Sequence, residues 1–281
     1  MVLDAHVHVF WREAVVRRQR LLRLDQYFGE LYRSPRARMA TTEELLDSMD
    51  AAGVDMAVLA GFGWADAGLC REHNAYILDS VRRNPGRLLG LAIANPRDTR
   101  EAERELAQRL DAGLSGIGEL MPDSAGYSWS QPQVTDCLAA LARAYEMPLL
   151  LHVSEPVGHL YPGKGSVAPA QVVSFAEHYP EVTLVCAHWG GGLPFYELMP
   201  EVQAALRRVY YDTAAWPLLY DDRIFQVAAR LVPEKVLFAT DYPLVRQDKA
   251  LERLRCAGLM PGLEQAYLGQ NALQVYRRRM E

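Results

Sequence analysis

Short apolar segments alternate with longer amphipathic segments along this chain. Most of the apolar segments are rich in Val, Leu or Ile, which is typical of strands buried on both faces. Eight such segments can be distinguished: Val2–Phe10, Val54–Ala60, Leu88–Ala94, Ser115–Leu120, Pro148–Val153, Val182–Ala187, Val209–Thr213 and Val236–Thr240. Between them, apolar residues recur at helical spacing, which predicts helices that include Thr41–Ala52, Glu101–Ala112, Val134–Tyr145 and Ala168–Tyr179.

Eight strands that alternate with helices predict an α/β fold with a parallel sheet. Eight strands also close a (β/α)8 TIM barrel, whose typical length is ~250 residues. We therefore expect a single barrel domain over residues 1–281. The alternative is an open, doubly wound sheet, but no glycine-rich dinucleotide-binding turn follows the first strand. The segment Trp11–Ala40 is much longer than an ordinary strand-to-helix loop, and in a barrel it would form a lid-like insertion over the active site.

The composition is that of an ordinary soluble protein, with 50% hydrophobic and 23% charged residues. No stretch is long and apolar enough for a transmembrane helix, and no secretory signal opens the sequence. The net charge of −5 argues against a nucleic-acid-binding surface. The four cysteines lie far apart, which favours a reduced, cytoplasmic environment. We expect a cytoplasmic protein without nucleic-acid or membrane partners.

Metal-ligating side chains gather at the ends of the predicted strands. His6 and His8 are two positions apart on the first strand, so their side chains project together, as in a metal chelate or in a pair of packed core histidines. Four further strand ends also carry such residues: Glu119, His152, His188 and Asp241. In a barrel these ends meet at one mouth, where unpaired polar groups are costly unless solvated or coordinated. The pattern predicts a metal site.

These motifs resemble the metal-dependent amidohydrolase superfamily, specifically its amidohydrolase-related branch, which contains decarboxylases and lactonases. The resemblance spans nearly the whole chain and rests on His6-x-His8, His152, Ala187-His188-Trp189-Gly190-Gly191, Ala239-Thr240-Asp241-Tyr242-Pro243 and the segment Tyr267–Ala272. It implies a (β/α)8 barrel with one or two divalent metals, usually zinc, although Mn, Fe and Co accept the same ligands. It also implies that the metal activates water and that Asp241 moves protons.

The number of metal ions depends on Glu119. The superfamily often bridges two metals with a carboxylated lysine, but no lysine of this chain lies at a strand end: the three are Lys164, Lys235 and Lys249. Glu119 could replace it, as in the branch resembling TatD-type deoxyribonucleases. If Glu119 and His188 both coordinate, the site could hold two metals. Otherwise one metal would be held by His6, His8, His152 and Asp241, and Glu119 would be an outer or substrate-binding carboxylate.

Asp241 and His188 are the candidate catalytic residues. Asp241 could simply begin a turn, but its position after an apolar strand favours a role in proton transfer from metal-bound water, whose pKa a metal can lower to about 7. His188 could take over that role or polarise a substrate carbonyl.

The loop after the fifth strand carries the candidate substrate-binding residues. Gly158–Lys164 almost matches a phosphate-binding loop, but Gly165 stands where a Ser or Thr is required. The loop could instead line a substrate pocket with Glu155, His159, Tyr161 and Lys164, or it could be an exposed polar loop. His73 and His178 are expected at the surface.

The segment Trp11–Ala40 carries eight arginines and three acidic residues. This charge favours a carboxylate-bearing small molecule. A solvated basic face, or contact with an acidic partner subunit in a homo-oligomer, is the alternative. We expect a metal-dependent hydrolase of a lactone, amide or similar bond. The alternatives are a metal-dependent decarboxylase of an aromatic or muconate-type acid, a TatD-type nuclease, which the negative charge disfavours, and a non-enzymatic metal-binding protein, which would not need Asp241.

Overall fold

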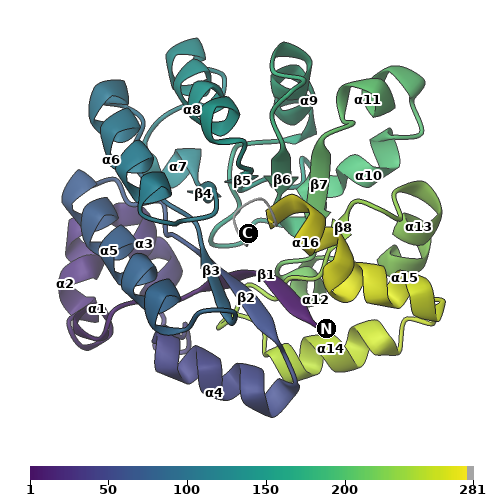
Figure 1. Ribbon diagram of the computed structural model, residues 1–281, viewed down its shortest axis with the longest axis horizontal. Coiled ribbons are helices and arrows are strands. Elements are labelled where there is room, and N and C mark those ends of the chain that lie inside the picture. Colours follow the sequence, from purple (N-terminus) through teal and green to yellow (C-terminus); the bar gives the residue numbers. More distant parts are fainter. Residues whose placement is uncertain (277–281) are drawn as a thin grey trace.

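The computed structural model describes residues 1–276. In this part of the chain a central set of strands is surrounded by helices (Figure 1). Each strand lies within one of the predicted apolar segments, so this prediction is confirmed. The strands are β1 (Leu3–His8), β2 (Met56–Ala60), β3 (Leu88–Gly90), β4 (Ile117–Leu120), β5 (Leu149–Leu151), β6 (Leu184–Cys186), β7 (Val209–Asp212) and β8 (Val236–Leu237).

Helices follow the strands in sequence. The four segments predicted as helical correspond to α4, α6, α8 and α9, with ends that differ by at most two residues. The helices are α1 (Arg12–Val16), α2 (Arg18–Leu24), α3 (Gln26–Tyr32), α4 (Thr42–Ala52), α5 (Ala67–Arg83), α6 (Thr99–Asp111), α7 (Pro122–Ala125), α8 (Pro132–Tyr145), α9 (Pro169–His178), η1 (His188–Gly192), α10 (Leu193–Tyr196), α11 (Pro200–Ala205), α12 (Trp216–Leu219), α13 (Ile224–Leu231), α14 (Gln247–Arg255), α15 (Pro261–Gln265), η2 (Ala266–Gln270) and α16 (Asn271–Tyr276).

The strands are parallel and follow the sequence order in two sheets, β1–β2–β3 and β4–β5–β6–β7–β8. Single parallel bridges join the two sheets at both junctions, Ala92 with Ile117 and Val7 with Tyr242. A doubly wound sheet would reverse its strand order at a switch point, and this sheet does not. The arrangement is an α/β fold with parallel sheets, consistent with the expected TIM barrel.

Two irregularities in strand pairing lie beside candidate ligands. The β1–β2 register shifts between Asp4 and Val7, and the β4–β5 register shifts between Ile117 and Leu120. Extra residues of this kind redirect side chains and are common next to active sites. Here they lie at His6 and at Glu119.

Helix α4 shows how local sequence sets the element boundaries. Thr41 caps it: its hydroxyl accepts a hydrogen bond from the Glu44 backbone, and the Glu44 carboxylate accepts one from the Thr41 backbone. Leu45 and Met49 are completely buried, one turn apart, against the core. Gly53, with φ of 73°, ends the helix in the left-handed conformation.

The long segment after β1 is mostly helical as far as Tyr32 and irregular from there to α4. It forms α1, α2 and α3, and its buried Phe28 packs against Phe10, Phe62 and Trp64. Because these rings follow directly after β1 and β2, aromatic packing holds α3 near the carboxyl ends of the first two strands.

The prediction that His73 lies at the surface is wrong, whereas His178 is exposed as predicted. His73 is fully buried on α5, where its Nε2 atom is 2.8 Å from the Val9 carbonyl oxygen and its Nδ1 atom accepts a hydrogen bond from the Trp64 indole. Burial lowers the pKa of His73 to about 4, so it is neutral. All four cysteines are free. Among residues 1–276, no helix has both the length and the apolar character needed to cross a membrane.

Candidate metal centre and its pocket

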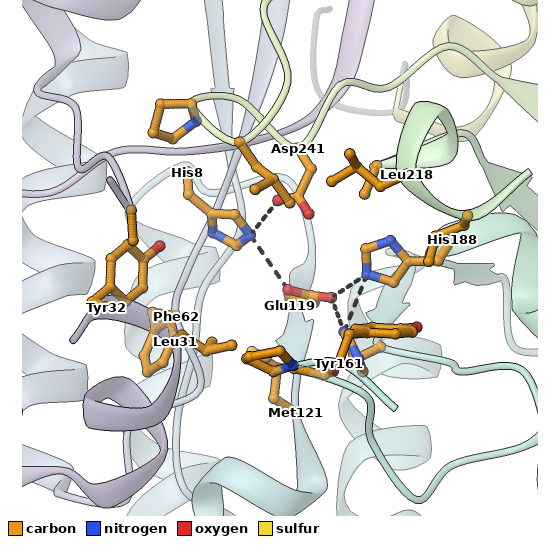
Figure 2. Close-up of a pocket in the computed structure, with 18 of the residues that line it drawn as sticks. His8, Leu31, Tyr32, Phe62, Glu119, Met121, Tyr161, His188, Leu218 and Asp241 are labelled. Carbon is orange, nitrogen blue, oxygen red and sulfur yellow. Dashed lines mark hydrogen bonds and ion pairs between the residues drawn. The ribbon is translucent and has the colours of Figure 1, made fainter. Parts of the chain in front are cut away.

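The six predicted ligands come from five strand ends and lie around one pocket. Five of them line it directly: His8, Glu119, His152, His188 and Asp241. His6 lies beneath them, completely buried. Figure 2 shows Glu119 near the centre, with His8 on its left, His188 on its right and Asp241 above it. The convergence expected from the barrel mouth is therefore present in the structure.

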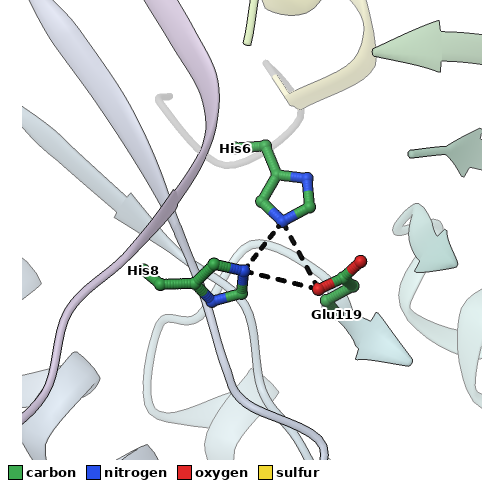
Figure 3. Close-up of side chains that lie close together, drawn as sticks. All are labelled: His6, His8 and Glu119. Carbon is green, nitrogen blue, oxygen red and sulfur yellow. Dashed lines mark hydrogen bonds and ion pairs between the residues drawn. The ribbon is translucent and has the colours of Figure 1, made fainter. Parts of the chain in front are cut away.

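His6, His8 and Glu119 form a first triad (Figure 3). The Nε2 atoms of the two histidines are 3.1 Å apart, and the Glu119 Oε2 atom is 3.5 Å from His6 and 3.4 Å from His8. The Nδ1 atoms face acceptors outside the triad. His6 Nδ1 is 2.8 Å from the Asp212 carboxylate, and His8 Nδ1 is 3.2 Å from the Ala60 carbonyl oxygen. Both Nδ1 atoms therefore carry a proton, so that the rings in their neutral form present their Nε2 lone pairs to the triad.

Glu119, His152 and His188 form a second triad. The Glu119 Oε1 atom is 2.8 Å from His152 Nδ1 and 3.7 Å from His188 Nε2, and these two nitrogens are 3.2 Å apart. The outer ring nitrogens again have backbone acceptors: His152 Nε2 donates to Gly163 and His188 Nδ1 donates to Ala214. Glu119 thus directs one carboxylate oxygen to each histidine pair.

This donor set fits a divalent metal ion. In each pair, two histidine lone pairs face one another at hydrogen-bond distance, which is repulsive unless a proton or a cation lies between them. Each histidine is oriented by a carboxylate or carbonyl acceptor on its other nitrogen, the arrangement that metal-ligating histidines almost always show. Imidazole and carboxylate ligands suit zinc, manganese and related ions.

The charges within the cluster point to the same conclusion. Burial opposes the charged form of His6, but the carboxylates of Glu119 and Asp212 raise its pKa well above the ordinary value. Burial likewise opposes the charged form of His188, but contact with Glu119 and the charge of Asp241 raise its pKa to about 9. Burial opposes the ionised form of Glu119, yet His6 and His152 hold its pKa well below the usual range. The cluster is an anionic cavity that attracts positive charge.

Asp241 lies beside His8, with Oδ1 3.4 Å from His8 Nε2, and its side chain is partly open to the pocket. It adopts the left-handed conformation with φ of 61°, which is uncommon for a residue other than glycine. Its amide donates to the His6 carbonyl oxygen at 2.9 Å. The preceding Thr240 is held by Asp4, which accepts hydrogen bonds from both its amide and its hydroxyl. Such strain is often found at functional sites.

Sequence reasoning did not identify Asp212, the last residue of β7, as part of the site. It is completely buried and contacts His6. The signal was available, since Asp212 stands at a strand end like the other site residues.

The pocket above the cluster has a volume of about 380 Å³, near the lower end of the range typical of ligand sites, ~300–1,000 Å³. Its walls are mostly apolar and aromatic, and they include Leu31, Tyr32, Phe62, Met121, Leu218, Leu219, Pro243 and Leu244. Arg38, an exposed residue after α3, also lines it. The pocket therefore combines a polar floor, apolar walls and one cationic side chain.

The predicted substrate-binding loop contributes only in part. His159 and Tyr161 line the pocket, whereas Glu155 and Lys164 do not. Glu155 accepts a hydrogen bond from the Tyr161 hydroxyl at 2.9 Å and so supports that ring from behind. Lys164 is directed back onto its own loop, where it donates to the carbonyl oxygens of Val157 and His159. Glu155 and Lys164 therefore form hydrogen bonds within the loop and do not line the pocket.

Comparison with known proteins identifies the family to which this chain belongs. The amidohydrolase family model matches residues 3–278. The chain belongs to the amidohydrolase family. No curated protein matches this amidohydrolase significantly.

Solved structures similar to this amidohydrolase include aromatic acid decarboxylases. The 5-carboxyvanillate decarboxylase of Sphingomonas paucimobilis is 20% identical, with a TM-score of 0.77 and 98% of each chain covered. The corresponding enzyme of Novosphingobium aromaticivorans, in complex with manganese and 4-hydroxy-3-methoxy-5-nitrobenzoic acid, is 18% identical, with a TM-score of 0.77 and coverage of 99% of this chain and 96% of that one. The 2,6-dihydroxybenzoate decarboxylase from Rhizobium is 17% identical, with a TM-score of 0.73 and 98% of each chain covered. At these identities the likeness establishes the fold.

Proposed function

We propose that this amidohydrolase is a metal-dependent decarboxylase of a small aromatic carboxylic acid. The observation that carries the proposal is the pocket: a floor of histidines and carboxylates lies under apolar and aromatic walls, with Arg38 as a cationic side chain beside them. Such walls accept a flat, apolar ring, and the floor and the arginine accept its polar substituents. The activities named for the similar solved structures point in the same direction.

In this proposal the histidines and carboxylates of the floor hold the metal and the walls hold the ring. His6, His8, Glu119, His152 and His188 are the proposed ligands, with Asp241 at their edge. When bound, the metal would act as a Lewis acid that orients and polarises the oxygens of the substrate.

Asp241 is the proposed proton donor. It lines the pocket beside His8 and so is placed to give a proton to the ring carbon that bears the carboxylate. Asp241 enters this step as the carboxylic acid. The carbon–carbon bond to the carboxylate then breaks, CO2 leaves, the ring keeps the new hydrogen, and the Asp241 carboxylate regains a proton from water before the next turnover. Apolar walls such as Phe62 and Leu218 exclude water from this step.

Hydrolysis, the main expectation from the sequence, is the second candidate. The observation in its favour is that Glu119 directs one oxygen to each histidine pair, so the cluster offers two adjacent metal positions with a shared carboxylate. Two-metal sites commonly activate water for hydrolysis. In that case Asp241 would accept a proton from water instead of donating one to a ring carbon.

The finer features expected from the sequence belong to the same proposal. We propose that the eight strands form one closed (β/α)8 barrel, that the segment with α1 to α3 serves as its lid, and that the enzyme works in the cytoplasm as a homo-oligomer. Zinc is the proposed metal. Manganese is the alternative, because it is bound in a similar solved structure and accepts the same ligands.

The deciding experiment is a product analysis of protein loaded separately with zinc and with manganese. The substrates are a panel of hydroxylated benzoates and a panel of lactones and amides. Release of CO2 together with the decarboxylated phenol is the expected result. Turnover of lactones or amides alone, without CO2, would replace the proposal by hydrolysis. Metal-stripped protein is the control for both panels.

A further inference from the structure

Asp212 contacts one histidine of each pair. Its Oδ2 atom accepts a hydrogen bond from His6 Nδ1 at 2.8 Å. Its Oδ1 atom accepts hydrogen bonds from the backbone amides of His188, at 3.1 Å, and of Ala214, at 2.9 Å. The carboxylate is completely buried at the end of β7 and does not line the pocket.

Each of these contacts fixes a different feature of the cluster. The bond to His6 keeps the proton on Nδ1, so that Nε2 presents its lone pair to His8 and Glu119. The bond to the His188 amide holds a residue whose φ is 57°, a left-handed conformation that is costly without support. Ala214, whose amide donates to Asp212, also orients the His188 ring, because its carbonyl oxygen accepts a hydrogen bond from His188 Nδ1.

We propose that Asp212 is a positioning residue that sets the tautomer of His6 and the orientation of His188, and so prepares both triads for metal. This inference rests on the metal site of the proposed function, but it does not depend on which reaction the enzyme catalyses. Outer carboxylates of this kind typically contribute 10- to 100-fold to metal affinity.

The substitution Asp212→Asn separates positioning from packing. Two backbone amides face Oδ1, so the amide oxygen of the asparagine stays with them and its NH2 group faces His6 Nδ1. The asparagine NH2 group and the His6 Nδ1–H group are both hydrogen-bond donors, so they cannot bond to each other. The proton of His6 must therefore move to Nε2, the atom that faces the triad. The shape of the side chain and the backbone contacts are preserved, while the ligand atom is lost.

The matched control is Asp25→Asn. Asp25 is also a buried carboxylate that accepts two backbone amides, from Phe28 and Ala65, but it contacts no histidine. Zinc affinity is measured by competition with a chromophoric chelator, and thermal unfolding of the metal-free proteins is measured in parallel. The ring N–H protons are followed by NMR on zinc-loaded, 15N-histidine-labelled protein, with the His6 signal assigned by its loss in His6→Gln.

We expect Asp212→Asn to lower zinc affinity by ~10- to 100-fold and to abolish the protected Nδ1–H signal of His6, whereas Asp25→Asn retains both. Wild-type affinity with an unchanged Nδ1–H signal in Asp212→Asn would overturn the inference. Equal losses of zinc affinity in the two variants would also overturn it, because they would reflect general destabilisation. If Asp212→Asn does not fold, wild-type spectra decide: a His6 ring that carries its proton on Nε2 refutes the inference. Failure of the wild-type protein to bind zinc or manganese would instead refute the metal site itself.

Discussion

Removal of metal should make the stability of this protein strongly dependent on pH, because the histidines of the cluster then hold protons in place of a cation. His188 shows this most clearly. Its pKa rises from 6.5 to about 9 in the folded protein, as the carboxylates of Glu119 and Asp241 outweigh the effect of burial. A raised pKa means that the protonated ring stabilises the fold. This contribution is complete below pH 6.5 and is lost as the pH rises through about 9.

The size of the effect follows from the shift. A rise from 6.5 to about 9 corresponds to about 3 kcal/mol of unfolding free energy, at ~1.4 kcal/mol per pH unit. We therefore expect the metal-free protein to lose about this much stability between about pH 6.5 and 9.5, and the raised pKa of His6 acts in the same direction. His73 does not contribute in this window, because its pKa of about 4 keeps it neutral throughout. The zinc-loaded protein should not show the loss, because zinc binds the neutral rings.

The assay is urea unfolding of chelator-treated protein over this pH range, followed by tryptophan fluorescence. The substitution His188→Asn isolates the contribution of His188, because the difference in stability between wild type and variant should shrink by about 3 kcal/mol from the acidic to the alkaline end. A difference that stays constant with pH would refute the reasoning. So would a wild-type stability that rises with pH in the absence of metal.

Three further predictions concern activity and metal content. Asp241→Asn should retain metal and lose ~10²- to 10⁴-fold in kcat, as measured by metal analysis and kinetics on one preparation; normal kcat would remove Asp241 from proton transfer and make His188 the next candidate. Glu119→Gln should lose metal, because an amide presents only one oxygen and no charge to the two histidine pairs; metal content by mass spectrometry equal to that of the wild type would show that Glu119 is not a ligand. Arg38→Gln should raise KM for a carboxylate substrate by about tenfold with little change in kcat, and an unchanged KM would show that Arg38 does not bind the substrate.

The sequence predicts the strands well because buried parallel strands are almost uniformly apolar. It predicts their ends less well. β8 pairs with β7 over Val236–Leu237 only, although the apolar segment continues to Thr240. The next two amides donate elsewhere, that of Phe238 to the Tyr267 carbonyl oxygen and that of Ala239 to the Thr213 hydroxyl. Hydropathy does not record where a ladder of hydrogen bonds stops.

The candidate ligands could be predicted because strand ends have fixed positions in this fold. Side chains on helices and loops lack that constraint. His73 was misplaced because α5 is buried by aromatic residues near the carboxyl end of β1, a contact that helical periodicity cannot foresee. The residue types of Glu155 and Lys164 suit a binding site, but the sequence does not reveal the loop conformation in which both form hydrogen bonds within the loop and not in the pocket.

The contact between His6 and Asp212 joins residues that are 206 positions apart, and Asp241, which lies beside His8, is more distant still. No early fragment of the nascent chain can therefore contain a complete metal site. Contacts of such long range form late in folding and slow it. On the proposed roles of Asp212 and Asp241, the histidines of β1 would bind a metal ion tightly only after β7 and β8 have been synthesised and have folded. A bound ion would be held by His6 and His8 of β1 together with Glu119 of β4, and so would oppose separation of the two sheets.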